Sequence, residues 1–368
     1  MSKKNKHIII SGGGTGGHVF PAISIANALK EMDPTIKILF VGAEDRMEMQ
    51  KVPDAGYDIK GLPIKGIQRK ITPKNLLVPF RLWQSLRRSK RLIKDFKPDA
   101  VVGVGGYASG PVLRTANRAG TPTLIQEQNS YAGITNRLLA KKAKKICVAY
   151  EGMENYFPKE KIVITGNPVR KNIIPTENKR EEAIKHFKLS PEHKTILSIG
   201  GSLGAESINN SIIEQLHQFE SNDIQLIWQC GKYYYQKANE ALKKYNLPNV
   251  RLMNFINRMD LAYAAADVII SRAGALSISE LALVKKPVIL IPSPNVAEDH
   301  QMKNAKSLAD NNAAIIIKDN ETKEQLVSKA LELIKDESHQ AELKQNIEQF
   351  AKPDSAKKIA EEIIKLTN

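Results

Sequence analysis

Two glycine-rich turns constrain the fold of this chain more than any other feature. The first, Gly12 to Gly17, follows the apolar run His7 to Ser11 and leads into a helical pattern. The second, Gly200 to Gly204, follows the apolar run Thr195 to Ile199 and also precedes a helical pattern. A strand that ends in a glycine turn before a helix brings backbone N–H groups against phosphate. We therefore predict two Rossmann-like halves that face a shared ligand.

The length and composition agree with this prediction. At 368 residues the chain exceeds the size that one core commonly supports, which favours two domains. With 42% hydrophobic and 26% charged residues it has ample material for two cores, and no apolar run approaches the roughly 18 residues that a membrane-spanning helix needs.

Strand-like and helical patterns alternate along both halves, as in parallel sheets with crossover helices. In the first half we expect strands at 7–11, 36–41, 99–104, 122–126, 145–149 and 161–165, and helices at 18–32, 80–96, 109–119 and 132–142. Gly166 to Pro168 marks a domain exit. In the second half we expect strands near 194–199, 224–229, 250–253, 267–271, 287–291 and 313–317. Three helical patterns close the chain, and Asp354 or Ser355 is expected to cap the last, which runs to Leu366.

Charge and cysteine content narrow the functional class. Cys147 and Cys230 give neither a disulfide framework nor a zinc spacing, so we expect two buried, inert thiols. The basic N-terminus lacks the apolar region of a signal peptide, which favours the cytoplasm. The net charge of +16 favours nucleic acid, anionic lipid or phosphorylated substrates as partners.

The first glycine turn supports more than one interpretation. Gly12, Gly14 and Gly17 fit a dinucleotide fingerprint, with Glu44 as a ribose ligand, and this would indicate an NAD-dependent oxidoreductase. The spacing to Glu44 is longer than usual, however, and the fingerprint does not explain the second glycine turn. A tight turn with a purely structural role is a further alternative.

His18 follows the first turn directly. At a helix N-terminus the dipole disfavours the imidazolium, which keeps a neutral base available. We predict that His18 is a general base, and the alternative is a histidine that only bonds to the backbone at the start of the helix.

Two more polar segments end strands of the first half. Gly103 to Pro111 is a third glycine cluster, and Glu127-Gln128-Asn129 follows the next strand. Because parallel strands end at the same edge of a sheet, these segments are predicted to converge with the first turn at a ligand site. A triplet such as Glu127 to Asn129 is otherwise an ordinary polar loop.

The second half has a corresponding edge. Ser271 to Glu280 leads from a strand into a helix that starts with small residues, whose N–H groups can approach a diphosphate, and Glu280 can bind a ribose diol. The alternative is a small-residue helix start with no ligand. Asn295 to Gln301 follows the next strand, and the Gln301 carboxamide suits sugar hydroxyls.

Charge on a leaving group would be met without a metal. The sequence contains no Asp-x-Asp pair, the metal–diphosphate clamp of one glycosyltransferase class. Helix N-termini, backbone donors and Arg170 are the expected replacements. No metal site and no cofactor is predicted.

A basic and apolar segment lies between Lys65 and Lys97. Its only acid is Asp95, and Leu76, Leu77, Val78, Phe80, Leu82 and Trp83 are interleaved with its cations. Exposed apolar residues ringed by cations suit the headgroup layer of an anionic membrane, and we expect membrane contact through Leu76, Leu77, Phe80 and Trp83. Nucleic acid is less favoured because only two aromatic residues occur here. The alternative is an ordinary helix with its apolar side in the core and a solvated basic face.

The chain resembles the MurG family, peptidoglycan glycosyltransferases that move N-acetylglucosamine from UDP-N-acetylglucosamine onto lipid I. The resemblance covers essentially the whole chain and consists of motifs in order: Gly13 to Pro21, Gly106 to Pro111, Glu127 to Asn129, Gly166 to Arg170, Gly200 to Ala205, Ser271 to Leu276, and Asp299 to Gln301 with Asn304 and Ala305. Leu203 stands where the family commonly has glutamine, and Ser277 replaces a frequent threonine.

The resemblance implies a GT-B fold, in which two Rossmann-like domains face each other across a cleft. We expect an acceptor and membrane-facing domain at 1–168, completed by a C-terminal helix at about 353–368, and a UDP-sugar donor domain at 169–352. The implied reaction is an inverting, metal-independent hexosyl transfer to the muramyl 4-hydroxyl of lipid I, giving lipid II and UDP. It would serve peptidoglycan synthesis, cell wall biogenesis, cell shape and division at the cytoplasmic face of the inner membrane.

The resemblance also implies roles for individual residues. The catalytic candidates are His18 first and Glu127 second. The UDP-N-acetylglucosamine site would comprise Thr15, Gly16, Gly17, Asn129, Arg170, Ser202, Ile256, Ala275, Leu276, Ser277, Ile278, Ser279, Glu280 and Gln301. The acceptor side would comprise Gly14, Gly106, Tyr107 and Ser109.

A diacylglycerol-dependent glycolipid synthase of the same fold and a non-catalytic membrane or nucleic-acid binder remain alternatives.

Overall fold

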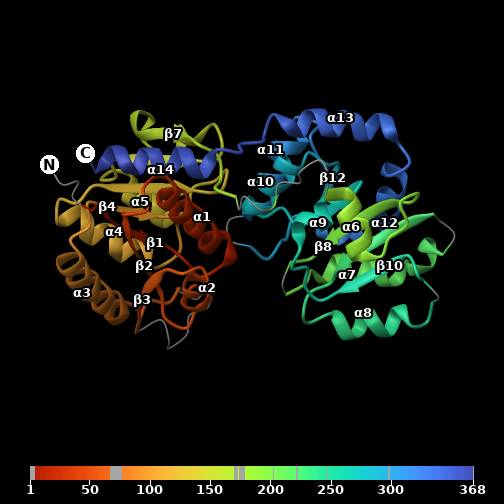
Figure 1. Cartoon of the computed structure of the whole chain (residues 1–368), viewed down its shortest axis with the longest axis horizontal. Helices are drawn as coiled ribbons and strands as arrows, with labels where there is room; N and C mark the ends of the chain where they lie inside the picture. The colour runs from red at the N-terminus through yellow and green to blue at the C-terminus, as the bar shows by residue number, and fades with distance from the viewer. Residues whose placement is uncertain are drawn as a thin grey trace. The chain divides into compact units, whose positions relative to one another are not determined.

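A computed structural model describes residues 5–66, 77–169, 173, 179–201, 203–220, 223–245, 247–296 and 299–367. The chain divides into two compact units: unit 1 comprises Met1–Arg170 and Lys352–Asn368, and unit 2 comprises Lys171–Ala351. Unit 2 is thus inserted in the sequence of unit 1 (Figure 1). Each unit is an α/β fold with its own parallel sheet.

The sheet of unit 1 has the strand order β3-β2-β1-β4-β5-β6-β7, and every pairing is parallel. Its strands are β1 (His7–Ser11), β2 (Lys37–Ala43), β3 (Asp58–Leu62), β4 (Ala100–Gly103), β5 (Thr123–Glu127), β6 (Lys145–Val148) and β7 (Ile162–Ile164). The order reverses between β1 and β4, and parallel sheets bind ligands at the carboxyl ends of the strands beside such a switch point.

Helices cover both faces of this sheet. They are α1 (Gly16–Met32), α2 (Glu48–Asp54), α3 (Val78–Phe96), α4 (Ser109–Arg118), α5 (Ile134–Ala140) and α14 (Ser355–Leu366), with 3-10 turns η2 (Met153–Asn155) and η3 (Lys159–Lys161). Because successive side chains of a strand point to opposite faces, Ile8 and Ile10 join one core and Ile9 joins the other. This explains why β1 is a continuous apolar run and not an alternating one.

Helix α14 returns to unit 1 and packs beside α1 (Figure 1). Its buried residues Ile359, Ala360 and Ile363 belong to the same core as Ile25 and Leu29 of α1. Unit 1 is therefore built from two pieces of chain that are far apart in the sequence.

Unit 2 has the strand order β10-β9-β8-β11-β12-β13, again with parallel pairings. Its strands are β8 (Lys194–Ile199), β9 (Ile224–Gln229), β10 (Val250–Met253), β11 (Val268–Ser271), β12 (Val288–Leu290) and β13 (Ile315–Ile316). Its helices are α6 (Lys179–Phe187), α7 (Glu206–Glu214), α8 (Tyr235–Leu242), α9 (Met259–Ala265), α10 (Ala275–Val284), α11 (His300–Ala309), α12 (Thr322–Leu333) and α13 (Glu337–Glu348), with 3-10 turns η5 (Leu216–Phe219) and η7 (Asp319–Glu321).

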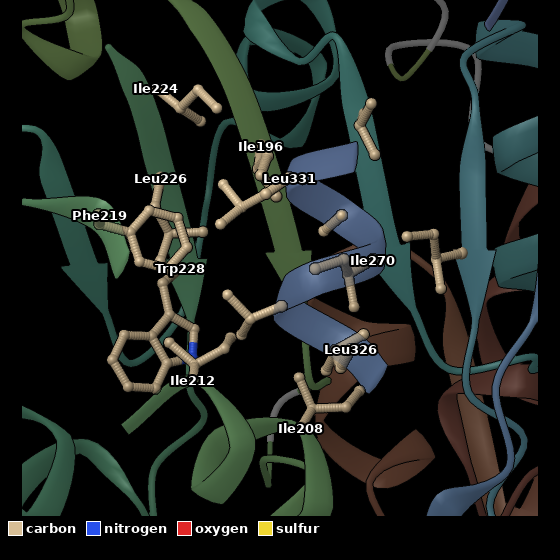
Figure 2. Close-up of a cluster of buried hydrophobic side chains, with 14 of the residues drawn as sticks. Ile196, Ile208, Ile212, Phe219, Ile224, Leu226, Trp228, Ile270, Leu326 and Leu331 are labelled. Atoms are coloured by element: carbon tan, nitrogen blue, oxygen red, sulfur yellow. The ribbon is translucent and has the colours of Figure 1, made fainter. Parts of the chain in front are cut away.

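The core of unit 2 is centred on Trp228 of β9, which is fully buried (Figure 2). Side chains of α7 and α12, such as Ile212 and Leu326, pack beside the same face of the sheet. The Trp228 indole N–H donates to Asn209 Oδ1 at 2.9 Å, and Asn209 Nδ2 donates to the Cys230 carbonyl at 2.8 Å. The polar atoms that accompany this large aromatic residue are therefore satisfied inside the core.

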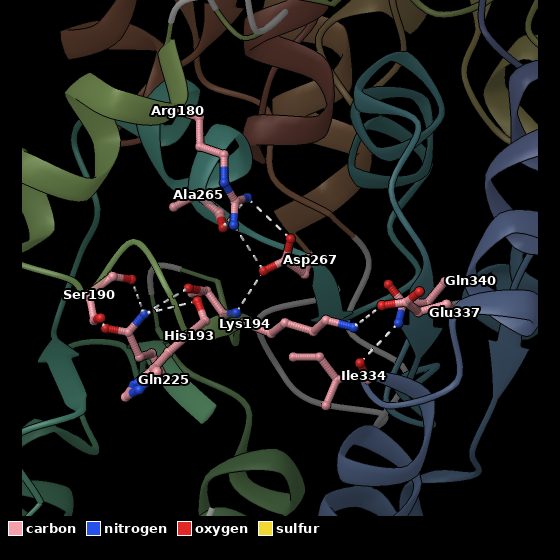
Figure 3. A network of polar contacts seen from close by, with 11 residues as sticks. Arg180, Ser190, His193, Lys194, Gln225, Ala265, Asp267, Ile334, Glu337 and Gln340 are labelled. Carbon is pink, nitrogen blue, oxygen red and sulfur yellow. Dashed lines mark hydrogen bonds and ion pairs between the residues drawn. The ribbon is translucent and has the colours of Figure 1, made fainter. Parts of the chain in front are cut away.

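A polar network lies at the amino ends of strands β8 and β11 in the sheet of unit 2 (Figure 3). Asp267 accepts hydrogen bonds from the Thr195 N–H at 2.8 Å and from Arg180 of α6 at 3.1 Å. Lys194, the first residue of β8, pairs with Glu337 of α13 at 2.8 Å. Charged side chains therefore stabilise the amino ends of these strands, whereas the glycine turns lie at the carboxyl ends.

The expected order of strands and helices is confirmed, with three differences. The edge strand β3 and the short helix α2 were not predicted: β3 has a polar, glycine-containing sequence that is only partly buried, and α2 contains Pro53. The third difference concerns the cap of α14, for which Asp354 was correctly expected as a candidate N-cap residue. Asp354 occupies the N-cap position without a side-chain hydrogen bond, and the Ser355 hydroxyl donates instead to the Lys352 carbonyl at 2.6 Å.

Both cysteines are free and buried, as predicted. Burial raises the pKa of Cys147 to about 12 and that of Cys230 to about 11. Neither thiol therefore carries thiolate character near neutral pH.

Candidate active site

The first glycine turn places a helix N-terminus at the switch point of unit 1. Thr15 is the N-cap residue of α1 in an extended conformation, and Gly16 and Gly17 begin the helix. The first N–H groups of a helix have no partner within the helix and carry partial positive charge. The turn can therefore bind an anion such as a diphosphate.

His18 lies in the first turn of α1 with its ring directed back toward the glycine turn. Its Nδ1 lies 3.2 Å from the Gly13 carbonyl oxygen and 3.4 Å from Thr15 Oγ1. A carbonyl oxygen can only accept, so Nδ1 carries the proton in this contact and Nε2 is the nitrogen that can receive one. A Cβ added to Gly105 would lie 2.8 Å from Nε2, which shows how closely the turn after β4 approaches the ring.

The third glycine cluster packs directly on the first. Gly106 has a φ of +82°, and a Cβ there would lie 2.3 Å from the Gly13 carbonyl oxygen. Among the predicted acceptor-side residues, Tyr107 is 53% exposed. Ser109 is fully buried and its hydroxyl donates to the Gly106 carbonyl at 2.9 Å, so it shapes the turn instead of offering its hydroxyl to a ligand.

Glu127 ends β5 as a buried carboxylate that accepts four hydrogen bonds. Oε1 accepts from the N–H and the Nδ2 of Asn129, at 3.1 and 3.2 Å, and Oε2 accepts from the Gly133 N–H at 3.0 Å and from Asn136 Nδ2 at 2.8 Å. The side chain is 2% exposed. Because both oxygens are engaged, Glu127 is suited to hold the loop that carries Asn129, and it is a weaker candidate than His18 for accepting a proton.

Sequence reasoning assigned no site role to a buried amide network beneath this edge. Gln126 Nε2 donates to Asn167 Oδ1 at 3.1 Å, Asn167 Nδ2 donates to the Gln128 carbonyl at 3.0 Å, and Gln128 Nε2 donates to the Val104 carbonyl at 2.7 Å. The network ties the ends of β4 and β5 to the segment after β7. Three amide side chains at strand ends were the available signal.

Sequence reasoning also missed Glu48, the first residue of α2, which is 1% exposed. Its Oε2 accepts the Gly14 N–H at 2.9 Å and its Oε1 accepts the Ala43 N–H at 3.0 Å. The Gly14 N–H, predicted to face the acceptor, is therefore used inside unit 1. Only the three-dimensional contact reveals this role, because Glu48 is distant from the turn in sequence.

In unit 2 the second glycine turn packs against the loop after β9. Gly201 and Gly204 have φ values of +79° and +93°, and a Cβ on Gly204 would lie 2.3 Å from the Cys230 carbonyl oxygen. Leu203, where the family pattern has glutamine, is 60% exposed. Ser202 lies outside the described residues, as do Arg170 and Leu76.

The helix α10 begins at the carboxyl edge of unit 2 with Gly274 as its N-cap. Ala275, Leu276 and Ser277 are partly exposed, which leaves its first turn accessible, whereas the Ile278 side chain is 2% exposed and belongs to the core. The Ser279 hydroxyl donates to the Ala275 carbonyl at 3.1 Å. Because its side chain is buried, Ile278 could contact a ligand only through its backbone.

Three further predicted donor residues make specific contacts in unit 2. Glu280 Oε2 accepts a hydrogen bond from the buried Tyr263 hydroxyl at 3.2 Å. The N–H of the buried Ile256 donates to Gln229 Oε1 at 3.0 Å. Gln301 Oε1 accepts the Ser293 N–H at 2.9 Å, so its amide nitrogen is the end that can donate to a sugar hydroxyl.

Arg272, the residue after β11, links three segments of unit 2: the start of α7, the segment after β12 and the start of η7. It donates to the Ile291 carbonyl and to Ser207 Oγ, each at 3.1 Å, and pairs with Asp319. Ser207 Oγ also donates to Asp319 Oδ1 at 2.6 Å. One guanidinium group therefore connects these three segments near the end of β11.

Near its start, helix α3 differs from an ordinary amphipathic helix because large apolar side chains are exposed there while serines are buried. Its buried residues are Ser85, Ser89 and Ile93. Phe80 and Trp83 are 55% and 54% exposed, and their rings stack with centroids 6.1 Å apart. The Arg87 guanidinium carbon lies over the Trp83 ring, 5.6 Å from its centroid. The alternative, in which the apolar side enters the core, therefore holds for Leu92, Ile93 and Phe96 near the end of the helix but not for Phe80 and Trp83 near its start.

The charge of the chain is concentrated in unit 1. Its lysines and arginines greatly outnumber its acids, whereas the two are nearly equal in unit 2, so the net charge of +16 lies on unit 1. None of the described helices is both long and apolar enough to cross a bilayer. Among the described residues, no group of three or more His, Cys, Asp or Glu is placed to hold a metal ion.

Comparison with known proteins identifies both halves. The glycosyltransferase family 28 N-terminal domain matches residues 8–148, and the C-terminal domain of the same family matches residues 195–361. Glu44, the ribose ligand of the oxidoreductase alternative, is instead paired with Arg88 at 2.5 Å.

The chain is also similar over its full length to curated proteins. The UDP-N-acetylglucosamine--N-acetylmuramyl-(pentapeptide) pyrophosphoryl-undecaprenol N-acetylglucosamine transferase of Bacteroides thetaiotaomicron is 57% identical over 366 residues, which cover 99% of this chain and 98% of the relative. The protein of the same name from Parabacteroides distasonis is 58% identical over 359 residues, which cover 98% of each.

Among solved structures, the crystal structure of Acinetobacter baumannii MurG matches with a TM-score of 0.78 and 30% identity, covering 98% of this chain and 99% of that chain. The UDP-GlcNAc 2-epimerase from Neisseria meningitidis, solved with UDP-GlcNAc bound, has a TM-score of 0.69 at 15% identity over 98% of this chain and 100% of that chain, and supports the fold alone.

Proposed function

Since the chain belongs to the MurG family within glycosyltransferase family 28, we propose that it transfers N-acetylglucosamine from UDP-N-acetylglucosamine to the muramyl 4-hydroxyl of lipid I, producing lipid II and UDP for peptidoglycan synthesis. The observation that carries this proposal is identity above one half over the full length of relatives that bear this activity in their names. The two helix N-termini at glycine-containing turns, one in each unit, supply the anion sites that two diphosphate substrates need.

We assign the donor to unit 2. The first turn of α10, from Ala275 to Ser279, would bind the diphosphate through backbone N–H groups, and Glu280 would accept from the ribose hydroxyls. Ile256 would lie at the uracil. Gln301 of this unit, together with Asn129, Arg170 and Ser202, would contact the sugar and its linkage to the diphosphate.

We assign the acceptor to unit 1. The diphosphate of lipid I would approach the N-terminus of α1, where Thr15, Gly16 and Gly17 present the first N–H groups, with Gly106 and Tyr107 beside it. The positive charge of unit 1 supports this assignment, because an anionic acceptor in an anionic membrane is attracted to that unit.

The transfer is proposed to invert the anomeric carbon in one displacement. The muramyl 4-hydroxyl oxygen bonds to the anomeric carbon, the bond from that carbon to the UDP oxygen breaks, and His18 Nε2 takes the hydroxyl proton. His18 is preferred to Glu127 because its Nδ1 carries the proton while both Glu127 oxygens already accept hydrogen bonds. Helix N-termini and Arg170 would stabilise the departing diphosphate without a metal.

The membrane is proposed as the docking partner of α3. Leu77, Phe80 and Trp83 are exposed apolar residues, and Arg87 and Lys90 are exposed cations beside them. Such a surface suits the headgroup layer at the cytoplasmic face of the inner membrane, where lipid I is embedded. Nucleic acid is not expected to bind, because two stacked aromatic residues amid aliphatic ones do not form a base-stacking platform.

The first experiment measures UDP release from UDP-N-acetylglucosamine with and without a lipid I analogue, in EDTA, and with other UDP-hexoses. Release that needs the acceptor, is specific for N-acetylglucosamine and is unaffected by EDTA is the expected result. Transfer to diacylglycerol in place of lipid I would indicate the glycolipid synthase, and binding without any release would indicate a non-catalytic protein.

The His18→Ala variant tests the base. General-base assistance contributes typically about 10² to 10⁴ in rate, so kcat should fall by that factor while UDP binding to unit 2 is unchanged. Glu127→Gln serves as the comparison. A larger loss of kcat in Glu127→Gln than in His18→Ala, with both variants folded, would reverse the assignment.

A further inference from the structure

Glu48 is a buried carboxylate to which the proposed reaction gives no part. A buried charge is costly unless strong hydrogen bonds compensate it. Glu48 is compensated by two backbone N–H groups, that of Ala43 at the end of β2 and that of Gly14 in the first glycine turn. It therefore connects α2 with the turn that precedes the proposed base.

The Gly13–Gly14 peptide group links Glu48 to His18. Its N–H, which belongs to Gly14, donates to Glu48 Oε2 at 2.9 Å. Its carbonyl, which belongs to Gly13, lies 3.2 Å from His18 Nδ1. The Gly13–Gly14 peptide is trans, and in a trans peptide the N–H and C=O point in opposite directions. The carboxylate and the imidazole therefore hold opposite ends of one peptide group.

We propose that Glu48 is a positioning residue that acts on His18 through this peptide group, keeping the proton on Nδ1 and leaving Nε2 to receive the proton of the acceptor hydroxyl. A hydrogen bond to the carboxylate polarises the peptide, which makes the Gly13 oxygen a stronger acceptor for the Nδ1 proton. The same contact stabilises the imidazolium that forms when Nε2 is protonated. The inference rests on the proposed function, in which His18 is the base.

The packing around Gly13 holds this peptide in one position. A Cβ on Gly13 would lie 2.1 Å from Glu48 Oε1, and a Cβ on Gly106 would lie 2.3 Å from the Gly13 oxygen. A Cβ on Gly105 would lie 2.7 Å from His18 Cδ2. Glu48, the first glycine turn, the turn after β4 and the His18 ring are thus closely packed, with no room for side chains at these glycines. Thr15 Oγ1 and the Gly105 backbone also lie near the ring, and Glu48 is a charged group linked to it through the Gly13–Gly14 peptide.

The Glu48→Gln variant is the first test. An amide has one acceptor oxygen and an NH₂ group that cannot accept, so one of the two backbone N–H bonds is lost. We expect kcat to fall roughly tenfold to a hundredfold, less than the about 10⁴ that follows alteration of a carboxylate in direct contact with a catalytic histidine, because a peptide group intervenes. UDP affinity, measured on unit 2, should be unchanged.

The matched control is Glu44→Gln. Glu44 directly follows strand β2, whose last residue, Ala43, donates to Glu48. Its own carboxylate is partly exposed and paired with Arg88, so this variant should keep the wild-type kcat. In a His18→Ala background, Glu48→Gln should add little further loss. An equal loss in both backgrounds would overturn the proposal, since Glu48 would then act on the fold and not on His18.

Nitrogen-15 NMR of labelled histidine provides a test that does not depend on activity, and its measurement on the wild-type protein needs no variant. In the wild-type protein we expect neutral His18 to carry its proton mainly on Nδ1, and in Glu48→Gln we expect a larger Nε2–H population. A wild-type ring protonated mainly on Nε2, or a tautomer ratio unchanged by Glu48→Gln, overturns the proposal. A fully active His18→Ala enzyme would instead reject His18 as the base of the proposed function, and the NMR result would still decide whether Glu48 controls the ring.

Discussion

At the scale of single residues, the candidate site distinguishes groups that hold the architecture from groups that are able to react. Glu127 accepts four hydrogen bonds and Ser109 donates to its own turn, so both are committed to structure. His18 has one nitrogen bonded to the backbone and the other directed to the turn after β4. This division of roles is the reason why we propose His18 and not Glu127 as the base.

Tyr263 provides a residue-scale prediction on the donor side. Its hydroxyl holds Glu280 Oε2, so Tyr263→Phe should leave the carboxylate less well oriented toward the ribose and weaken UDP binding by about 1 kcal/mol, roughly fivefold. Calorimetry with UDP measures this. Tyr245→Phe, at a partly buried tyrosine of the unit 2 core, is the control. If Tyr263→Phe weakens 2′,3′-dideoxy-UDP by the same factor, the hydroxyl does not act through ribose recognition.

Some of these residues could be predicted from the sequence and others could not. His18, Glu127 and Glu280 follow strands or begin helices, and the carboxyl ends of parallel strands share one edge, so local pattern is enough to bring them to a site. Glu48 and Tyr263 act through contacts between elements whose packing the pattern does not specify. Local periodicity contains no information about which side chain a neighbouring turn will meet.

At the scale of elements, α3 departs from the rule that a helix buries its large apolar residues. It contacts α4 and buries Ser85, Ser89 and Ile93, whereas Phe80 and Trp83 are exposed. An exposed apolar group surrounded by cations marks an interaction surface. The alternating charge and apolar pattern was visible in the sequence, but which of its faces is buried was not.

The Trp83→Glu variant tests this element. Removing a large apolar side chain and adding a negative charge should lower binding to vesicles that contain anionic lipid by tenfold or more, because burying such a side chain contributes about 1.5–3 kcal/mol. Co-sedimentation with vesicles measures the change. Tyr233→Glu is the matched control, because Tyr233 is an exposed aromatic residue of unit 2 (74%). Equal losses in both variants would remove α3 from membrane contact.

At the scale of the whole molecule, unit 1 depends on a helix that follows unit 2 in the chain. Ile363 of α14 is fully buried in the core that it shares with α1. Ile363→Ala should therefore lower the free energy of unfolding of unit 1 by about 2–5 kcal/mol and leave unit 2 unchanged.

Calorimetry or urea unfolding with a probe for each unit measures this effect. Ile347→Ala, an equally buried isoleucine of α13, is the reciprocal control and should affect unit 2 alone. A loss confined to unit 2 in the Ile363→Ala variant would contradict the two-piece construction of unit 1.

The position of α14 also has a consequence for synthesis on the ribosome. As the nascent chain emerges, all of unit 2 is synthesised before α14. Until then, Ile25 and Leu29 of α1 lack the α14 side chains that complete their core. Folding of the earlier sequence is completed after that of the later one. A chain interrupted between the end of unit 2 and α14 would thus damage the half that was made first.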